Sequence, residues 1–236
     1  MKVLVVGSSP AWPNPGSAHA GYLVDERLLL DCGPGVLARL RERWTWPPLE
    51  AIVITHFHLD HWGDLVPWVW GATFGPGVDA GRLDLWLPPD GRAQLAHLGE
   101  RLGTANMFEQ AFWVREYAEQ IPFRAAGLQV TAARVPHYEL ETYAVRVSDG
   151  ERTLTYSGDS APADELIEIA RDADLFVCEA TLDAREDGER GHLSAEEARD
   201  AAERAGVKRL VLTHRPQELT TPDGVEVAYD GLELTV

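Results

Sequence analysis

Cysteine is scarce in this chain of 236 residues, which has only two, Cys32 and Cys178. Each lies at the end of an apolar run of the kind found in strands, and neither belongs to a Cys-x-x-Cys pair. This pattern indicates two reduced thiols in the core of a cytoplasmic protein, rather than a disulfide or a thiolate metal site.

Long apolar segments are also lacking, because none approaches the ~18 residues that a membrane span requires. The amino-terminal segment 1–7 reads as a strand followed by a glycine turn. It lacks the apolar stretch and the small-residue cleavage site of a signal peptide. We therefore expect no membrane segment and a cytoplasmic location.

Basic residues are few, since 21 Lys and Arg stand against 38 Asp and Glu, and the formal charge is −17. The densest basic run, Arg39, Arg41 and Arg43, has helical spacing and is typical of a solvated helix face. A surface this acidic repels a polyanion. A large nucleic acid is therefore not an expected partner.

Metal-binding side chains, in contrast, are concentrated directly after the apolar run 51–54. That run is short, β-branched and not alternating, as expected of a strand buried on both faces. The carboxyl end of such a strand lies at the sheet edge where α/β proteins place their sites. The side chains that follow within nine residues are three histidines and two aspartates: His56, His58, Asp60, His61 and Asp64.

Three more metal-capable residues, His137, Asp159 and His214, each follow an apolar strand-like run. Taken singly, each has a simpler explanation than metal binding, as a residue of a turn, a cap or the solvent-facing surface. Together with the cluster they complete the ligand set of a two-metal site. We predict that one ion is bound by His56, His58 and His137, that the other is bound by Asp60, His61 and His214, and that Asp159 bridges the two.

Nitrogen and oxygen donors of this kind suit zinc first, and manganese or iron as well. Two ions ~3.5–4 Å apart lower the pKa of a shared water and stabilise both oxygens of an in-line displacement. No protein nucleophile is then needed. Consistently, the sequence contains neither a Gly-x-Ser-x-Gly elbow nor a Gly-x-x-x-x-Gly-Lys-Ser/Thr phosphate loop.

The remaining pattern predicts one domain over residues 1–236, with two β-sheets between helical layers. A Pro-rich loop, residues 8–17, is expected beside the histidine cluster. Aromatic residues at helical spacing in segment 106–119 indicate a helix whose aromatics belong to the core or line a substrate wall. The expected strands are 2–7, 20–24, 27–32, 51–54, 83–87, 128–135, 142–148, 152–157, 174–179 and 209–213, and the expected helices are 36–43, 63–72, 90–103, 106–119, 163–173 and 195–206.

The motif from His56 to His61, followed by His137, Asp159 and His214, resembles the metallo-β-lactamase fold superfamily. The similarity is closer to its ribonuclease Z-like branch, which shares a Leu-Leu-Leu-Asp-Cys-Gly run (residues 28–33) and a Glu-Ala-Thr segment followed by His-x-Ser/Thr (residues 179–181 and 192–194). The resemblance implies a four-layer αββα sandwich, two divalent metal ions and a homodimer.

The same resemblance implies that His192 lies beside a scissile phosphate, where it protonates the leaving oxygen or stabilises charge. The resemblance also implies that Asp60 is the catalytic carboxylate. Glu179 is a candidate for orienting His192. Asp31 and Asp64 fit either of two roles, as partners of metal-binding imidazoles or as turn caps.

One departure concerns the long arm that clasps tRNA in the tRNA-processing members of the branch. It usually lies between the equivalents of His137 and Asp159, which only 21 residues separate here. Two expected strands occupy these residues, so the arm is absent from this position. Together with the charge, this favours a substrate smaller than tRNA.

The leading hypothesis is a metal-dependent phosphodiesterase that acts on a cyclic nucleotide or a short RNA end. The second hypothesis is a carboxylic ester, lactone or thioester hydrolase, because the same water suits an acyl carbon and Trp12, Trp62 and Trp68 offer apolar surroundings. Two more hypotheses are a tRNA 3′-processing endonuclease without the arm and a non-catalytic module that binds metal or nucleotide.

Overall fold

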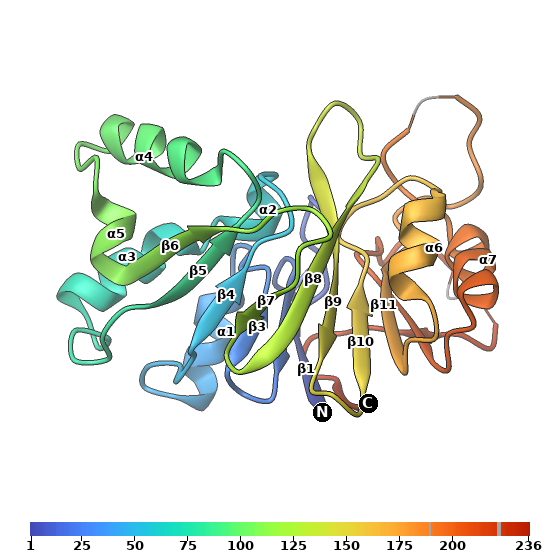
Figure 1. Ribbon diagram of the computed structural model, residues 1–236, viewed down its shortest axis with the longest axis horizontal. Coiled ribbons are helices and arrows are strands. Elements are labelled where there is room, and N and C mark those ends of the chain that lie inside the picture. The colour runs from blue at the N-terminus through green and yellow to red at the C-terminus, as the bar shows by residue number, and fades with distance from the viewer. Residues whose placement is uncertain (189, 221–222) are drawn as a thin grey trace.

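The computed structural model describes residues 1–188, 190–220 and 223–236, and it places two seven-stranded sheets face to face between helices (Figure 1). In the first sheet the strand order is β14-β1-β2-β3-β4-β5-β6. In the second it is β13-β12-β11-β10-β9-β8-β7. This arrangement confirms the αββα sandwich expected from the sequence.

The strands of the first sheet pair antiparallel from β14 to β3 and parallel from β3 to β6. Their bounds are β1 Lys2–Gly7, β2 Gly21–Val24, β3 Leu28–Leu30, β4 Ala51–Val53, β5 Leu83–Leu87, β6 Phe112–Glu116 and β14 Glu233–Thr235.

The second sheet has the same division, parallel from β13 to β10 and antiparallel from β10 to β7. Its strands are β7 Phe123–Ala125, β8 Leu128–Val135, β9 Thr142–Ser148, β10 Thr153–Tyr156, β11 Leu175–Glu179, β12 Leu210–Thr213 and β13 Glu226–Val227. β9 and β10 occupy most of the interval in which a tRNA-clasping arm would lie.

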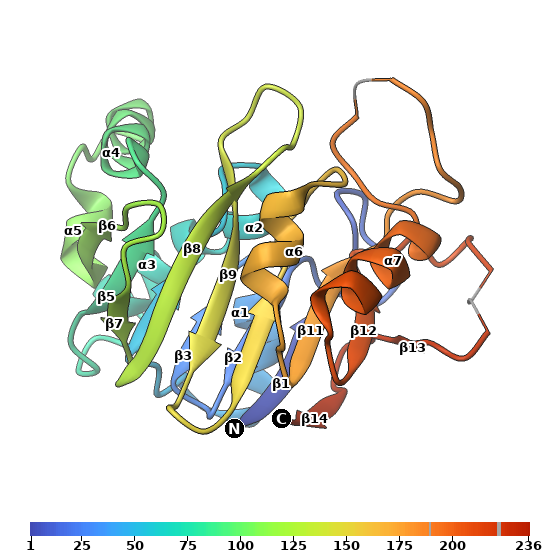
Figure 2. The ribbon, with the colours of Figure 1, turned by 45° about the vertical axis from the view of Figure 1, so that its right-hand side comes forward.

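Helices cover the outer face of each sheet (Figure 2), and in the second sheet α6 packs on β8 and β9 while α7 packs on β11 and β12. The helix bounds are α1 Val36–Arg43, α2 Leu59–Trp62, α3 Leu65–Phe74, α4 Gly91–Arg101, α5 Met107–Ala111, α6 Asp164–Ala170 and α7 Ala195–Ala205. In the part of the chain that the structure describes, no helix has both the length and the apolar character to cross a bilayer.

Three apolar cores hold the four layers together, one between the sheets and one under each helical layer. The strand β4 shows why its sequence does not alternate. Ala51 and Val53 face the core between the sheets, whereas Ile52 faces the core beneath the helices. Because both faces are buried, every position is apolar.

The expected helix over 106–119 is wrong, because α5 ends at Ala111 and the chain continues as β6. Phe112 and Val114 are buried, whereas Trp113 and Arg115 are exposed, and this period of two fits an edge strand paired with β5. Phe108 and Phe112 lie in the core beneath the helices.

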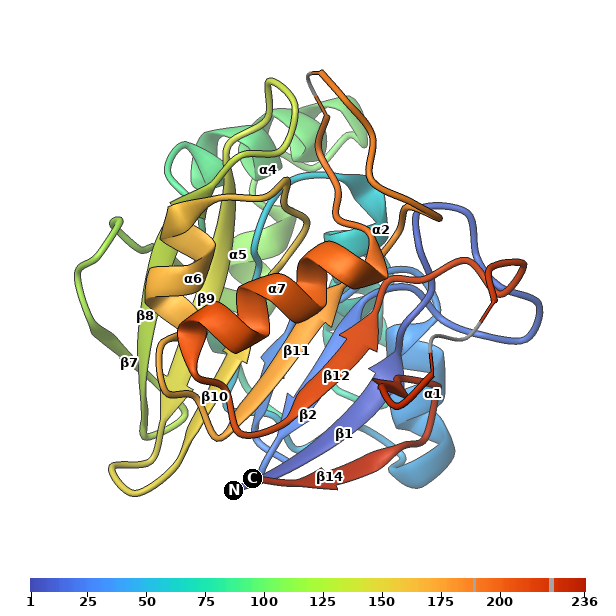
Figure 3. The same cartoon turned by 90° about the vertical axis from the view of Figure 1, so that its right-hand side faces the viewer.

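Other differences from the expected elements lie mainly at the chain end and at short strands. β7, β13 and β14 are not among the expected elements, and β14 adds to the free edge of β1 (Figure 3). The helix expected over 63–72 is present as α3, and a separate short helix, α2, precedes it over Leu59–Trp62. Trp68 on α3 is fully buried in the core, so it is not available to bind a substrate.

Candidate metal centre

Seven metal-capable side chains converge at one edge of the sandwich, where strands of both sheets end. His56 and His58 follow β4, and Asp60 and His61 lie on the short helix α2. The other three come from the second sheet, since His137 follows β8, Asp159 follows β10 and His214 follows β12. The structure therefore brings together all the ligands predicted from the sequence.

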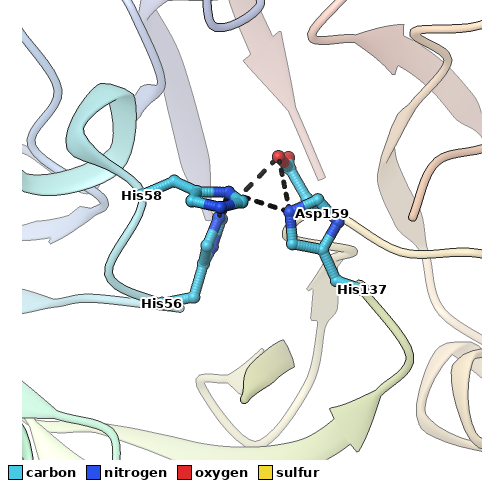
Figure 4. Close-up of side chains that lie close together, drawn as sticks. All are labelled: His56, His58, His137 and Asp159. Atoms are coloured by element: carbon cyan, nitrogen blue, oxygen red, sulfur yellow. Dashed lines mark hydrogen bonds and ion pairs between the residues drawn. The ribbon is translucent and has the colours of Figure 1, made fainter. Parts of the chain in front are cut away.

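The first cluster consists of His56, His58, His137 and Asp159, whose side chains approach from two sides (Figure 4). His58 Nδ1 lies 3.3 Å from His56 Nε2 and 2.9 Å from His137 Nε2. Asp159 Oδ2 lies 3.7 Å from the Nε2 atoms of both His56 and His137.

The second cluster consists of Asp60, His61, Asp159 and His214. Asp60 Oδ2 lies 3.3 Å from His61 Nε2 and 3.1 Å from His214 Nε2. Asp159 Oδ1 lies 3.3 Å and 3.6 Å from the same two nitrogens. Because its other oxygen, Oδ2, belongs to the first cluster, the Asp159 carboxylate lies between the two.

The spacing of these donor atoms fits a metal ion at the middle of each cluster. Ligands about 2.0–2.2 Å from a tetrahedral zinc ion lie about 3.3–3.6 Å from one another. Moreover, two buried atoms that point into the second cluster, His61 Nε2 and Asp159 Oδ1, form no hydrogen bond within the described residues. Buried polar atoms without a partner are uncommon and call for an explanation such as an ion.

Four of the five imidazoles are oriented through Nδ1, which leaves Nε2 directed at the clusters. His56 Nδ1 lies 3.0 Å from Thr55 Oγ1, and His214 Nδ1 lies 2.9 Å from Thr181 Oγ1. His137 Nδ1 lies 2.6 Å from the Gly191 carbonyl oxygen. A donated Nδ1–H fixes the tautomer, so that the Nε2 lone pair is free for a metal ion.

The fourth imidazole, His61, depends on Asp31, whose carboxylate is fully buried beneath the site. Asp31 Oδ2 accepts hydrogen bonds from His61 Nδ1 at 2.7 Å, Thr55 Oγ1 at 2.9 Å and the Tyr156 hydroxyl at 2.9 Å. Of the two roles left open by the sequence, Asp31 therefore has the first, as the partner of an imidazole in the cluster.

Asp64 has the other role. Its Oδ2 accepts a hydrogen bond of 2.7 Å from the backbone N–H of Leu37, in the first turn of α1. Burial raises the pKa of this carboxyl to about 6, against the opposing effect of the helix N–H groups. Asp64 thus caps a helix from a distant part of the chain.

Two ionised carboxylates in the clusters supply the negative charge that a bound cation requires. Burial and the neighbouring His61 lower the pKa of His56 well below its usual value, so this imidazole is neutral. Burial opposes ionisation of Asp60 and Asp159, yet their contacts with imidazoles hold both pKa values well below the usual range. Burial also lowers the pKa of His61, but the nearby carboxylates outweigh it and raise that pKa.

His192 stands beside the clusters with a carboxylate behind it. Its Nδ1 lies 2.8 Å from Glu179 Oε1, and the Glu179 carboxylate also accepts the backbone N–H groups of Ser160 and Thr181. Burial lowers the pKa of His192, but the contact with Glu179 raises it to about 9. Glu179 therefore orients His192 and keeps it protonated at neutral pH.

The clusters open into a cavity of about 420 Å³. The Pro-rich loop forms one side of it, as expected from the sequence. The lining residues are Ala11, Pro13, His19, Pro34, His58, Leu59, Asp60, Asp159 and His192.

Several residues of this site carry no metal-binding side chain and gave little signal in the sequence. Thr55 and Thr181 each lie next to a motif residue, and that adjacency was the available clue. Gly191 contributes only a carbonyl, and Tyr156 contributes a hydroxyl from the middle of the core. His19 does carry an imidazole, but its ring belongs to neither cluster and instead contacts the Ala11 and Pro34 carbonyls, which fixes the Pro-rich loop.

Comparison with known proteins agrees with this geometry. Residues 26–215 match the family described as the beta-lactamase superfamily domain. The probable metallo-hydrolase YhfI of Bacillus subtilis is 32% identical, over 92% of this chain and 87% of that protein. Its crystal structure superposes with a TM-score of 0.84 over 99% of both chains, at 27% identity. A ribonuclease Z of Myxococcus xanthus is 27% identical, over 98% of this chain and 96% of its own length.

Proposed function

This chain belongs to the beta-lactamase superfamily and is a metal-dependent hydrolase, and we propose that its substrate is a small phosphodiester, such as a cyclic nucleotide or a short RNA end. The observation that carries the proposal is the His192–Glu179 pair at the wall of the cavity. A protonated imidazole there suits the anionic oxygens and the leaving oxygen of a phosphodiester.

We assign the ligands of two divalent ions, zinc by preference, in the grouping expected from the sequence. His56, His58 and His137 would hold one ion, Asp60, His61 and His214 would hold the other, and Asp159 has an oxygen available to each. When bound, such ions would supply Lewis acidity and would lower the pKa of a water molecule, which makes water a usable nucleophile at neutral pH.

The residues of the chain then have separate tasks. Asp60 and Asp159 would balance the positive charge of the ions. Glu179 holds Nδ1 of His192, which leaves Nε2 for a hydrogen bond or a proton transfer to the leaving oxygen. Proton transfer of this kind contributes about 10²–10⁴-fold to a rate.

Two features support a small substrate rather than a tRNA. The cavity of about 420 Å³ is near the lower end of the range for small-molecule sites, about 300–1,000 Å³. The interval between His137 and Asp159 forms a short turn and one hairpin, β9 and β10, which leaves no room for the arm. The net charge of −17 also disfavours a long polyanion. The relative named ribonuclease Z supports phosphodiester chemistry in this superfamily.

The test is turnover of bis(p-nitrophenyl) phosphate by chelator-stripped protein to which zinc or manganese is returned. We expect activity that saturates near two ions per chain. His192→Ala is expected to lose about 10²–10⁴-fold in kcat and to keep its metal content, whereas His97→Ala, at an exposed position on α4, retains full activity. Faster turnover of p-nitrophenyl esters than of the phosphodiester would assign the site to acyl substrates instead.

A further inference from the structure

Three large exposed side chains belong to segments that border the metal cavity. They are Trp12, Leu59 and Tyr138, with 55%, 62% and 56% of their surfaces exposed. We call these three residues the apolar rim. Large apolar side chains exposed together beside a polar site are typical of a ligand-binding surface.

Each member of the rim adjoins the lining of the cavity. Leu59 is itself a lining residue, and Trp12 lies between two others, Ala11 and Pro13. The ring centroid of Tyr138 lies 5.8 Å from that of His192, with the planes at 77°. Leu59 thus lines the cavity, Tyr138 lies beside His192, and Trp12 belongs to the loop that forms one side of the cavity.

Trp12 is carried by a loop that is fixed at several points. His19 contacts the Ala11 carbonyl at 3.2 Å through Nε2 and the Pro34 carbonyl at 3.1 Å through Nδ1. Asn14 donates a hydrogen bond of 3.0 Å to the Arg215 carbonyl, across to the segment that follows β12. A loop held in this way presents an aromatic side chain with little loss of entropy on binding.

Tyr138 is held in place by its backbone and by a glycine. Its φ of 49° is in the left-handed region, which bulky side chains rarely adopt. A Cβ on Gly191 would collide with the Tyr138 ring, so that ring rests directly on the backbone there. Strained backbone of this kind clusters at ligand sites, where the surroundings fix it.

We propose that the apolar rim binds the base of a nucleotide, with Trp12 and Tyr138 as stacking surfaces and Leu59 as an apolar contact. This inference rests on the proposed phosphodiesterase function and specifies its substrate class. Aromatic side chains stack on any base, because every base has a π-face. The phosphodiester of the same nucleotide then reaches His192 and the metal-binding clusters.

The experiment compares two phosphodiesters, one with a base and one without. Adenosine 2′,3′-cyclic phosphate and adenosine 3′,5′-cyclic phosphate carry the base, and methyl p-nitrophenyl phosphate does not. The variants are Trp12→Ala and Tyr138→Ala, with Tyr138→Phe as the conservative partner. Trp113→Ala is the matched control, because Trp113 is 51% exposed but lies on the edge strand β6 beneath Arg82.

We expect Trp12→Ala and Tyr138→Ala each to raise the KM for a cyclic nucleotide by about 5- to 150-fold, the range measured for loss of one stacked base. For methyl p-nitrophenyl phosphate, Trp12→Ala keeps the kcat and KM of the parent protein, and Tyr138→Ala, whose missing ring lies beside His192, loses less than it loses on a cyclic nucleotide. All values for Tyr138→Phe and Trp113→Ala remain those of the parent protein. Calorimetric binding of adenosine monophosphate weakens by a similar factor in the two alanine variants.

Each remaining outcome is decisive as well. Equal losses on both kinds of substrate, or no loss on either, overturn the rim as a base-binding surface and leave the phosphodiesterase proposal standing. The same holds if the parent protein cleaves methyl p-nitrophenyl phosphate but neither cyclic nucleotide. If it cleaves no phosphodiester at all, the proposed function itself fails. Trp12→Ala keeps the test valid should Tyr138→Ala fold poorly, because Trp12 lies on an exposed loop.

Discussion

Replacing Asp31 by Asn tests whether the buried network beneath the metal centre controls metal affinity. Asp31 accepts four hydrogen bonds, from the backbone N–H and the hydroxyl of Thr55, from His61 Nδ1 and from the Tyr156 hydroxyl. Its φ of 57° is one that Asn also tolerates. The substitution therefore changes charge and hydrogen bonding but leaves shape and backbone unaltered.

The magnitude follows from the donors that lose their acceptor. The amide of Asn retains one acceptor oxygen, and it places an NH₂ group against the donors that face the other oxygen of Asp31. The two hydroxyls, of Thr55 and Tyr156, rotate to accept from that NH₂, but the N–H of His61 does not. Losing one or two charge-assisted hydrogen bonds of about 1.5–3 kcal/mol each lowers the stability of the metal-free protein by about 3 kcal/mol.

The metal centre is affected through the tautomer of His61. Without its acceptor, the imidazole gains by moving its proton to Nε2, the atom that points into the second cluster. Loss of such an oriented partner typically costs about 10–100-fold in metal affinity. The first cluster, which His61 does not join, retains its affinity.

Competition with a chromogenic zinc chelator measures both affinities, and a thermal melt of the stripped protein measures stability. We expect one weakened equivalent of zinc out of two and a melting temperature lower by about 6–12 °C, at about 2–4 °C per kcal/mol for a protein of this size. Asp64→Asn is the matched control and binds zinc as the parent does, because Asp64 caps α1. Two unweakened equivalents in Asp31→Asn, together with an unchanged melt, would refute the reasoning.

Three further predictions concern the same site. Glu179→Gln lowers the pKa of His192, which Glu179 raises to about 9. The alkaline limb of the pH profile of kcat/KM therefore moves to lower pH, and an unmoved limb contradicts the role of the His192–Glu179 pair. Zinc at 100 times its Kd stabilises the stripped protein by about 2.7 kcal/mol per site, so a melt should rise by at least about 5 °C, and no rise argues against a built site. Asp64→Ala removes the cap on Leu37 and lowers the unfolding free energy by about 1–2 kcal/mol in a denaturant titration, with zinc affinity unchanged.

Much of the site could be predicted from the sequence, because each ligand follows an apolar strand. The rule that strands carry sites at their carboxyl ends groups His137, Asp159 and His214 with the cluster after β4. Local chemistry also predicts the capping box at α7, where Ser194 Oγ accepts the Glu197 N–H and the Glu197 side chain accepts the Ser194 N–H. These features depend only on residues close together in the chain.

The errors arise where the outcome depends on distant contacts. Phe108 and Phe112 fit a helical period, but Phe112 and Val114 also fit a strand, and only the free edge of β5 decides between them. Likewise β14 forms because β1 has an unpaired edge, more than two hundred residues away in the chain. Asp31 and Asp64 are equivalent on sequence grounds, and only their partners separate them.

The position of Asp159 explains why metal binding and folding should be linked in this protein. His56, His58, Asp60 and His61 are attached to the first sheet, whereas Asp159 and the remaining ligands are attached to the second. Ions held by both groups would therefore join the two halves of the sandwich at this edge. Without ions, that junction places two buried carboxylates against imidazoles that burial tends to neutralise. Metal binding should therefore stabilise the packing of one sheet on the other, and a thermal melt measures this stabilisation.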